Sequence, residues 1–348
     1  MVALITGVGY IGAALADALL ADGQLVVGLE NGFSTVPAAV NALARRPGFV
    51  LVRGSVNSAR SIDRAFQAAR TLAGAAGTAG ADAAGGVDVV YHLAAQASAS
   101  PQAAPASYTE ATNLVAPRLV YEAAVQHGAT ALVYGGSFRV YGDDLTGTVT
   151  ERTPYGRIGD LSHTTKVYAE KLLEMLASHH PLPAVSVRLG VVYGLGPLMK
   201  DDARFLTVPN LFCRRVVQGQ PLVVHPGANR PIGFLHLDDA VRALRAAASF
   251  AQAQPPGAGE LAVNAVSEAL GVGEVAAIVE HEAAARGLTA DIQGAGLLTG
   301  PRWAVSSLLD AAGFRPRHRM AESLGAVLDY YRQQEQRRTQ PRARSTRR

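Results

Sequence analysis

Short apolar runs alternate with longer amphipathic segments through the first half of the chain, and this rhythm constrains the fold more than any other feature. The apolar runs are VALIT, LVVGLE, FVLVRG, VDVVYHLAA, ATALVYGGS and AVSVRLGVVYG, with segments of helical spacing between them. Strands that are apolar on both faces and joined through helices form parallel sheets covered on both sides. We therefore predict an α/β fold with a doubly wound, Rossmann-type parallel sheet.

The rhythm breaks after about Gly194, where loops, short strands and separate helices follow. We predict a Rossmann-type domain over residues 1–194, to which parts of the later chain return, and a smaller substrate-binding lobe over residues 195–331. The segment 332–348 contains seven arginines and one glutamate and has no apolar periodicity. Because it cannot bury enough surface to offset its ordering entropy, we predict a disordered basic tail with no nucleic-acid partner.

The composition is that of a compact globular protein, with 348 residues, 49% hydrophobic content and a mean hydropathy of +0.13. No uninterrupted apolar stretch is long enough to span a bilayer, and the N-terminus runs into a glycine motif without a basic segment. We expect a cytoplasmic protein without a membrane partner. The single cysteine, Cys213, excludes a disulfide framework and a cysteine-based zinc cluster, and we predict no metal site.

A glycine motif follows the first apolar run. In LITGVGYIGAALADAL, Gly7, Gly9 and Gly12 form a GxGxxG pattern between the first strand and the first helix. Such glycines let the backbone approach a pyrophosphate, whose charge the free amides of the helix N-terminus hold. Glu30 ends the second apolar run, where a carboxylate accepts hydrogen bonds from a ribose diol and would repel the extra phosphate of NADP. We therefore predict NAD as the cofactor.

Further motifs occur in a fixed order along the chain: VVGLENGFST, VVYHLAAQAS, VYGGSFRVYGD, RLGVVYGLGP and GFLHLDDAVRAL. Together they resemble the extended short-chain dehydrogenase/reductase family, the NAD-dependent epimerases and dehydratases that act on nucleotide sugars. The resemblance runs from Val2 to about Tyr331. It implies a small-molecule substrate, most simply a nucleotide sugar, and a homodimer formed through the helices at Ala116–Gln126 and Ser162–Ser178.

The resemblance also implies site residues, although the chain departs from the family in places. Ser55 replaces a usual acidic residue, Gly190 and Val191 replace an aromatic residue and an asparagine, and the glycine loop is one residue shorter. The implied cofactor-binding residues are Gly7, Gly9, Tyr10, Ile11, Gly12, Glu30, Asn31, Ser55, Val56, Leu93, Ala94, Ala95, Asn113 and Lys166. The implied substrate-binding residues are Gln96, Tyr141 and Arg230, and Ser137 has the position of a catalytic hydroxyl that contacts the reacting oxygen.

The largest departure is at Ser162. In the family a tyrosine stands four residues before the active-site lysine, and Lys166, one of three lysines in the chain, keeps the lysine position. Ser162 cannot replace a phenol, because an alcohol is a far weaker acid and the side chain is shorter. It could cap the helix or relay protons through water. His163 is our first candidate for the proton carrier, and Tyr155 could swing into the vacant place.

Three functions follow from these observations. The first is an NAD-dependent epimerase or dehydratase of a nucleotide sugar, with Ser137, Ser162, His163 and Lys166 as catalytic residues. The second is a catalytically degenerate NAD-binding sensor or scaffold, since the tyrosine is missing. The third is an atypical ketone or alcohol dehydrogenase, which Glu30 disfavours insofar as it would use NADP.

Overall fold

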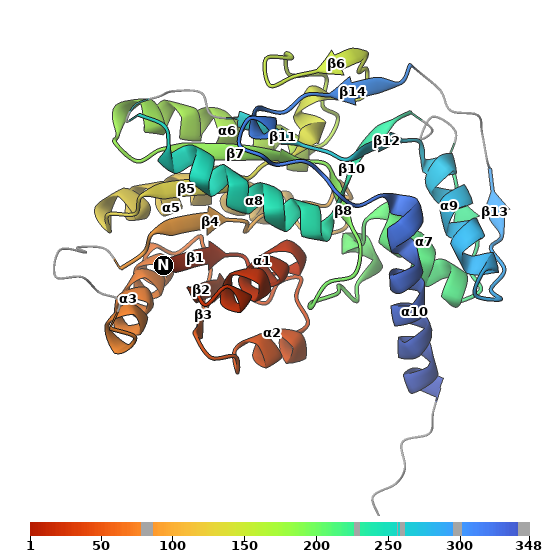
Figure 1. Cartoon of the computed structure of the whole chain (residues 1–348), viewed down its shortest axis with the longest axis horizontal. Coiled ribbons are helices and arrows are strands. Elements are labelled where there is room, and N and C mark those ends of the chain that lie inside the picture. The colour runs from red at the N-terminus through yellow and green to blue at the C-terminus, as the bar shows by residue number, and fades with distance from the viewer. Residues whose placement is uncertain (78–85, 226–229, 256, 258–261, 295–300, 340–348) are drawn as a thin grey trace, which may run out of the picture.

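The computed structural model describes residues 1–77, 86–225, 230–255, 257, 262–294 and 301–339. Its centre is a seven-stranded parallel sheet with the order β11-β7-β5-β4-β1-β2-β3 (Figure 1). The strands are β1 (Val2–Thr6), β2 (Leu25–Glu30), β3 (Phe49–Arg53), β4 (Val89–His92), β5 (Ala131–Gly135), β7 (Ala184–Leu189) and β11 (Ala262–Ala265). The six apolar runs of the first half supply β1 to β5 and β7, so the α/β prediction is confirmed.

Helices bury both faces of this sheet. Neighbouring residues of β1 belong to different hydrophobic cores: Ile5 packs with the side of α1 (Tyr10–Ala21) and α8 (Leu237–Gln252), and Leu4 with the opposite side. That opposite side is covered by α3 (Ala59–Ala75), α5 (Ala116–Gln126) and α6 (Leu161–His179). Strands buried on both faces explain why the apolar runs are continuous rather than alternating.

Shorter helices connect these layers. They are α2 (Pro37–Leu43), α4 (Ala106–Glu110), a π-helical turn (Ala111–Val115) and three 3-10 turns (Phe138–Tyr141, Ala203–Phe205 and Leu308–Asp310). None of the described helices is long and apolar enough to cross a lipid bilayer.

The later chain forms a lobe of helices and small sheets beside the main sheet (Figure 1). Its helices are α7 (Val208–Val217), α9 (Val272–Ala284) and α10 (Met320–Thr339). The small strands here pair as β12-β10-β8, β13-β9 and β14-β6, that is, Glu268–Leu270 with Ile232–His236 and Val191–Tyr193, Ile292–Gln293 with Leu222–Val223, and Trp303–Val305 with Gly147–Val149. Of these, β6 and β8 come from the first part of the chain. Because β11 and α8 return to the main sheet, the two predicted parts of the chain are interleaved.

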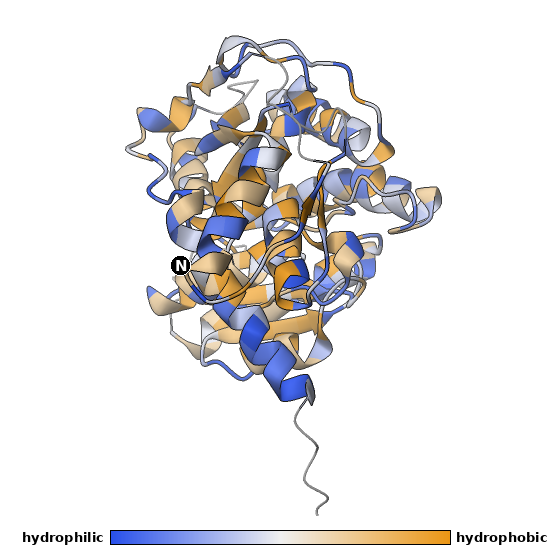
Figure 2. Ribbon diagram, turned by 90° about the vertical axis from the view of Figure 1, so that its right-hand side faces the viewer, coloured by the Kyte–Doolittle hydropathy of each residue, from blue (hydrophilic) through white to orange (hydrophobic). Residues whose placement is uncertain are grey.

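Helix α10 corrects the prediction of a disordered tail from residue 332. Met320, Leu324, Leu328 and Tyr331 bury one side of its first turns, and the helix then continues to Thr339. Figure 2 shows this last part as a hydrophilic stretch that projects from the body of the molecule. Gln, Glu and Arg are good helix formers, and adding turns to an existing helix avoids the cost of nucleation. Residues 340–348 of the predicted tail lie outside the described residues.

Candidate active site

The turn from β1 into α1 is packed so closely that side chains are excluded at Gly7 and Gly12. Gly7 has a φ of +84°, and a Cβ there would lie 2.6 Å from the backbone N and Cα of Ala94. A Cβ on Gly12 would lie 2.1 Å from the Gly7 carbonyl oxygen. Gly9 is the N-cap of α1 and brings no side chain to the first helical amides. The turn therefore offers backbone N–H groups to an anion that can approach closely.

Glu30 lies beside this turn, because the Gly7 amide donates to Leu29 O at 2.8 Å. The Glu30 Oε1 atom accepts hydrogen bonds from Gly32 N at 2.7 Å and from Thr35 Oγ1 at 3.3 Å. Within the described parts of the chain, no hydrogen bond reaches Oε2. The carboxylate is thus oriented by its own loop and keeps one oxygen for a ribose hydroxyl.

A cavity of about 670 Å³ adjoins the same loop. It is lined by residues 33–36, by residues 101–105, and by Asp201, Asp202, Arg204 and Phe205. Asn31 Nδ2 donates to the Tyr108 hydroxyl at 3.1 Å, and the Tyr108 ring stacks on Phe33 with centroids 4.0 Å apart. Asn31 therefore braces the loop that bounds the cavity.

The other predicted cofactor residues lie around the glycine turn or hold it in place. Ser55 and Val56 follow β3: the Ser55 hydroxyl accepts from Asn57 N at 3.1 Å, and Val56 is buried in the core. Leu93 N donates to Thr6 O at 2.9 Å, and Ala94 and Ala95 continue this half-buried segment. Ile11 packs against the core, and the Tyr10 hydroxyl donates to Gly194 O at 2.6 Å. The Tyr10 side chain thus ties α1 to the segment after β8.

Lys166 brings a buried amine to the carboxyl end of β5. Its residue is 6% exposed, and Nζ donates to Gly135 O at 2.7 Å and lies 4.7 Å from the centroid of the Tyr134 ring. Desolvation lowers the pKa of the Lys166 amine to about 7. Among the described residues no carboxylate pairs with this amine. Since a buried amine without an acidic partner costs stability, its place here favours a ligand-binding role.

His92 is a neighbour of Lys166 that the sequence interpretation did not single out. It ends β4, is fully buried, and its Nδ1 lies 2.7 Å from Thr6 Oγ1. Burial, and secondarily the charge of Lys166, lowers the pKa of His92 to about 3. Its Nε2 has no hydrogen-bond partner among the described residues. The only sequence signal was its place as the last residue of a strand in a parallel sheet.

Asn113 has a structural role that corrects its assignment as a cofactor ligand. Its Oδ1 accepts from Gln96 N, and its Nδ2 donates to Gln96 O and to Thr165 Oγ1, all at 2.9 Å. The side-chain amide is buried and occupied by these bonds, which fasten the segment after β4 to α6. The Gln96 side chain is available instead, since its buried Oε1 has no partner within the described residues.

The start of α6 tests whether Ser162 caps the helix, one of the two roles considered for it. Asp160 is the N-cap and accepts from His163 N at 3.0 Å, so a capping role for Ser162 is wrong. Ser162 lies within the helix, and its buried hydroxyl donates to Gln96 O at 2.9 Å. His163 Nδ1 lies 2.8 Å from both carboxylate oxygens of Asp160. One carboxylate therefore caps the helix and orients the imidazole.

Ser137 follows two residues after Gly135, the last residue of β5, whose carbonyl oxygen accepts from Lys166 Nζ. It is the N-cap of the 3-10 turn Phe138–Tyr141, and its Oγ accepts from Arg139 N at 3.3 Å. The hydroxyl proton is not committed by that bond, because the oxygen is the acceptor. Ser137, half-buried at the carboxyl end of the sheet, can donate to a bound oxygen.

Comparison with known proteins shows which family the chain belongs to. The model of the NAD dependent epimerase/dehydratase family matches residues 3–262. The chain belongs to this family. The recognition made from the sequence motifs is thereby confirmed, and the match includes the glycine turn, Glu30 and α6.

Several proteins that resemble the chain in sequence or structure are named as UDP-sugar 4-epimerases. UDP-glucuronate 4-epimerase 1 of Arabidopsis thaliana is 25% identical over 248 residues, which cover 69% of this chain and 53% of that protein. The chain thus spans about half the length of this relative. The UDP-glucose 4-epimerase of Bifidobacterium longum, solved with NAD+ and UDP, has a TM-score of 0.76 at 17% identity, covering 96% of this chain and 98% of that one.

A third relative is the UDP-glucose 4-epimerase of Thermus thermophilus, solved with NAD. It has a TM-score of 0.74 at 23% identity, covering 95% of this chain and 99% of that chain. At these identities the likeness establishes the fold alone. The Rossmann-type architecture predicted from the sequence is confirmed by it.

The residues present fit the NAD of this family. A backbone turn that a Cβ would fill, a carboxylate at the end of β2 and a buried amine at the end of β5 lie along the same edge of the sheet. A dinucleotide needs these three groups for its pyrophosphate, one ribose and the other ribose. Gly7, Gly9, Gly12, Glu30 and Lys166 are the residues that would hold it.

The hydrogen bonds of Tyr141 and Tyr155 differ from those predicted for these two side chains. The buried Tyr141 hydroxyl accepts from Arg188 Nη1 and lies 2.8 Å from Asn264 Oδ1, so it is a core group rather than a substrate contact. The Tyr155 hydroxyl donates to Glu170 Oε1 at 2.7 Å and does not fill the place of the missing tyrosine.

Both tyrosines are held by the buried ion pair of Glu170 and Arg188, whose Oε1 and Nη2 lie 2.5 Å apart. The sequence could not reveal this pair, because it forms only when α6 packs against β7. Arg230 is exposed and pairs with Asp144. A substrate contact of Arg230 stays a prediction.

Proposed function

We propose that the chain is an NAD-dependent epimerase of UDP-hexoses or UDP-hexuronates in which His163, oriented by Asp160, takes the place of the missing tyrosine. The family membership and the names of the relatives support the reaction class and the UDP-sugar substrate. The proposal about the proton carrier rests on one observation, the contact of 2.8 Å between His163 Nδ1 and the Asp160 carboxylate.

The Asp160 contact prepares the imidazole for proton transfer. Partial burial acts to raise the pKa of Asp160, but hydrogen bonds from the side chain and backbone of His163 outweigh it and hold that pKa below its ordinary value. An ionised carboxylate at Nδ1 keeps a proton on that nitrogen and leaves Nε2 to accept and return one. An imidazole with one nitrogen protonated and the other free can accept and return a proton, as general acid–base catalysis requires.

The proposal gives the other residues the following roles. Ser137 donates its hydroxyl proton to the reacting oxygen, and His163 Nε2 removes and later restores the proton of that oxygen. Lys166 binds and orients the nicotinamide ribose, and Gln96 Oε1 accepts a hydrogen bond from the sugar. NAD, held by Gly7, Gly9, Gly12, Glu30 and Lys166, would supply reversible hydride acceptance, so no outside oxidant would be needed.

The experiment compares His163→Gln with the wild-type chain. Turnover of UDP-glucuronate and UDP-glucose is followed by NMR detection of the C4 epimer, and NAD affinity by calorimetry. We expect kcat to fall roughly 100-fold or more in His163→Gln, the range of one general acid–base group, with NAD affinity unchanged. Asp160→Asn should lower kcat less and shift the pH profile, because it disturbs the orienting group only.

Ser162→Ala is the matched control on the same helix. It removes a hydroxyl that donates to a backbone carbonyl, and we expect kcat within a few-fold of the wild type. Full activity of His163→Gln would refute the proton-carrier role. A loss in Ser162→Ala as large as in His163→Gln would move that role to Ser162.

A second candidate is an NAD-binding scaffold without turnover. Ser162 occupies the tyrosine position, and the Tyr155 hydroxyl is committed to Glu170, which supports this alternative. It predicts that the wild-type chain binds NAD but converts no sugar nucleotide, and that Ser162→Tyr gains turnover. Loss of existing turnover in Ser162→Tyr would instead favour the histidine mechanism.

A further inference from the structure

We propose that His236, Asp238 and His318, none of which is assigned to the proposed active site, bind one divalent transition-metal cation. His236 ends β10, Asp238 lies in the first turn of α8, and His318 lies just before α10. One ligand atom from each of the three side chains can be chosen so that all lie within 4.8 Å of one another.

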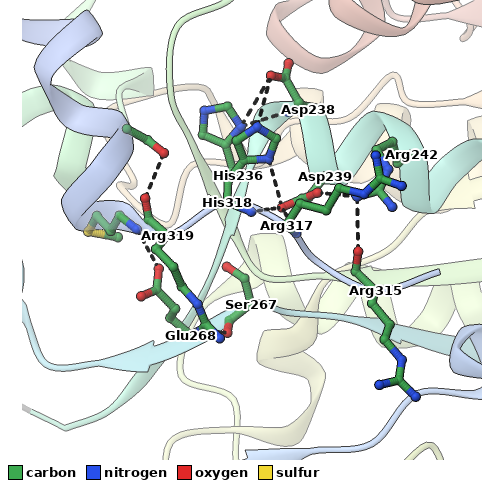
Figure 3. A network of polar contacts seen from close by, with 12 residues as sticks. His236, Asp238, Asp239, Arg242, Ser267, Glu268, Arg315, Arg317, His318 and Arg319 are labelled. Atoms are coloured by element: carbon green, nitrogen blue, oxygen red, sulfur yellow. Dashed lines mark hydrogen bonds and ion pairs between the residues drawn. The ribbon is translucent and has the colours of Figure 1, made fainter.

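The two imidazoles converge on one carboxylate (Figure 3). His236 Nδ1 and His318 Nε2 each lie 3.7 Å from Asp238 Oδ2. The two rings stack with centroids 4.3 Å apart and an interplanar angle of 23°. Two ligands bound to one tetrahedral ion at ordinary zinc–nitrogen and zinc–oxygen distances are about 3.4 Å apart. The two nitrogen–oxygen distances exceed this value by about 0.3 Å, and all three ligand atoms lie within 4.8 Å of one another, so a bound ion would draw them together and turn the two stacked rings toward it.

Hydrogen bonds assign a lone pair, not a proton, to both nitrogens that face Asp238. The His318 Nδ1 atom lies 3.2 Å from the buried Asp239 Oδ2, which places the ring proton on Nδ1 and leaves Nε2 bare. The Asp238 amide donates to His236 Nδ1 at 3.2 Å, as the N-cap bond of α8, so that nitrogen also carries a lone pair and a bound ion would replace this long hydrogen bond. With that bond exchanged, two lone pairs and a carboxylate oxygen would bind the cation.

Asp239 acts as an outer carboxylate that orients the ligand. Its Oδ2 also accepts from the amides of Arg317 and His318, each at 2.9 Å, and its Oδ1 accepts from Arg242 at 2.7 Å. A carboxylate that holds the second nitrogen of a histidine is the usual partner of a metal-binding imidazole. His236 is fixed in turn by Gly194, where an added Cβ would lie 2.5 Å from Nε2.

The ligand set selects the kind of metal. Two imidazoles and one carboxylate suit Zn²⁺, Co²⁺, Ni²⁺ or Cu²⁺, while Mg²⁺ and Ca²⁺ prefer sites made of oxygen ligands. The side chains of Asp238 and His318 are 62% and 37% exposed. Ions can therefore reach the cluster, and water can complete the coordination. A bound ion would cross-link the start of α8 to the segment that leads into α10.

The experiment uses the full chain with no affinity tag, stripped with a chelator and dialysed. Zn²⁺ and Mg²⁺ are titrated by calorimetry, and bound zinc is counted by mass spectrometry of the metal. We expect one zinc per chain and no binding of Mg²⁺. His318→Asn keeps an amide nitrogen near Asp239 but removes the ligand Nε2, and Asp238→Asn removes the carboxylate charge. Each should weaken zinc binding at least about 10-fold.

His281→Ala, which removes an exposed histidine of α9, is the matched control and should bind zinc as the wild type does. Circular dichroism checks that each variant is folded. If His318→Asn fails to fold, Asp238→Asn decides, because Asp238 is exposed. The proposal is overturned if the wild-type chain binds no stoichiometric zinc, or if Asp238→Asn binds zinc as tightly as His281→Ala. Neither result depends on epimerase activity.

Discussion

At the scale of one residue, the buried amine of Lys166 lowers the free energy of unfolding. The amine is buried, its pKa is lowered to about 7, and no carboxylate among the described residues offsets its charge. In the unfolded chain the same amine has a pKa near 10.5. An amine that loses its hydrating water without gaining an acidic partner is expected in a binding site rather than in a structural core.

The first prediction is that Lys166→Met flattens the rise of stability between pH 7 and 9. Over that range the unfolded wild-type chain binds more protons than the folded one, so the free energy of unfolding should increase with pH, by about 1.4 kcal/mol for each unit of pKa difference titrated. Below pH 7 both states are protonated and the cost of the buried charge is fully present. Urea unfolding of the ligand-free chain at pH 7, 8 and 9 measures the slope.

Lys171→Met is the control, because Lys171 lies on the same helix with an exposed side chain that pairs with Glu174. It should keep the wild-type slope. Other groups that titrate in this range, such as the Cys213 thiol whose pKa burial raises, contribute equally to every variant and cancel in the comparison. Equal slopes for Lys166→Met and the wild type would contradict the burial of a titrating amine.

At the same scale, the sequence predicts the groups that depend on local spacing. The glycines, Glu30 and Lys166 could be singled out because their positions relative to a strand end or a helix turn carry the signal, and their cofactor contacts stay predictions. The contact of Ser162 with Gln96 and the orientation of Asn113 could not be found, since they depend on segments brought together by folding. Asp160 and Ser162 are both good N-cap residues, and only the path of the chain into α6 selects Asp160.

At the scale of elements, the main sheet could be predicted because its strands are continuous apolar runs separated by helices. The short strand pairs of the lobe could not be predicted. Strand β14 at Trp303–Val305 pairs with β6 at Gly147–Val149, and strands of three residues have too little periodicity to identify each other over such a separation. The end of α10 was missed for the opposite reason: its composition suggests a solvated chain, but a buried helix precedes it.

The second prediction separates the fold of the β1–α1 turn from its use. Gly12→Ala places a Cβ 2.1 Å from the Gly7 carbonyl oxygen, so we expect the turn to be displaced and the melting temperature to fall by several degrees. In Gly9→Ala the nearest atom to the new Cβ is Thr35 Cγ2 at 4.0 Å, and we expect the wild-type melting temperature.

Calorimetric titration with NAD gives the second readout for this pair. The Gly9 methyl group would stand at the helix N-terminus where a pyrophosphate approaches, so Gly9→Ala should lose at least about 10-fold in NAD affinity while staying folded. Undiminished NAD affinity in Gly9→Ala would show that the phosphate does not use this turn. A normal melting temperature in Gly12→Ala would contradict the packing of the turn.

At the scale of the whole molecule, α6 and the end of the π-helical turn before α5 carry large apolar side chains that the described residues leave exposed. Leu161, Tyr168 and Met175 are spaced seven residues apart on α6 and are 39%, 48% and 47% exposed. Val115, just before α5, is 52% exposed. Residues seven apart lie on the same side of a helix, so these side chains form a stripe rather than isolated exposures. A second copy of the chain is the simplest partner for it.

The third prediction is that the stripe is a homodimer interface. We expect the wild-type chain to be a dimer by light scattering after gel filtration and the double variant Tyr168→Glu, Met175→Glu to be a monomer, because two carboxylates at the centre of a self-complementary interface face their own copies. Leu308→Glu, at an equally exposed leucine outside α5 and α6, should stay dimeric. A monomeric wild type, or a double variant that stays dimeric, would leave the stripe without this partner. Since α6 also carries His163 and Lys166, a monomeric variant with reduced turnover but unchanged NAD affinity would show that dimerisation steadies the catalytic helix.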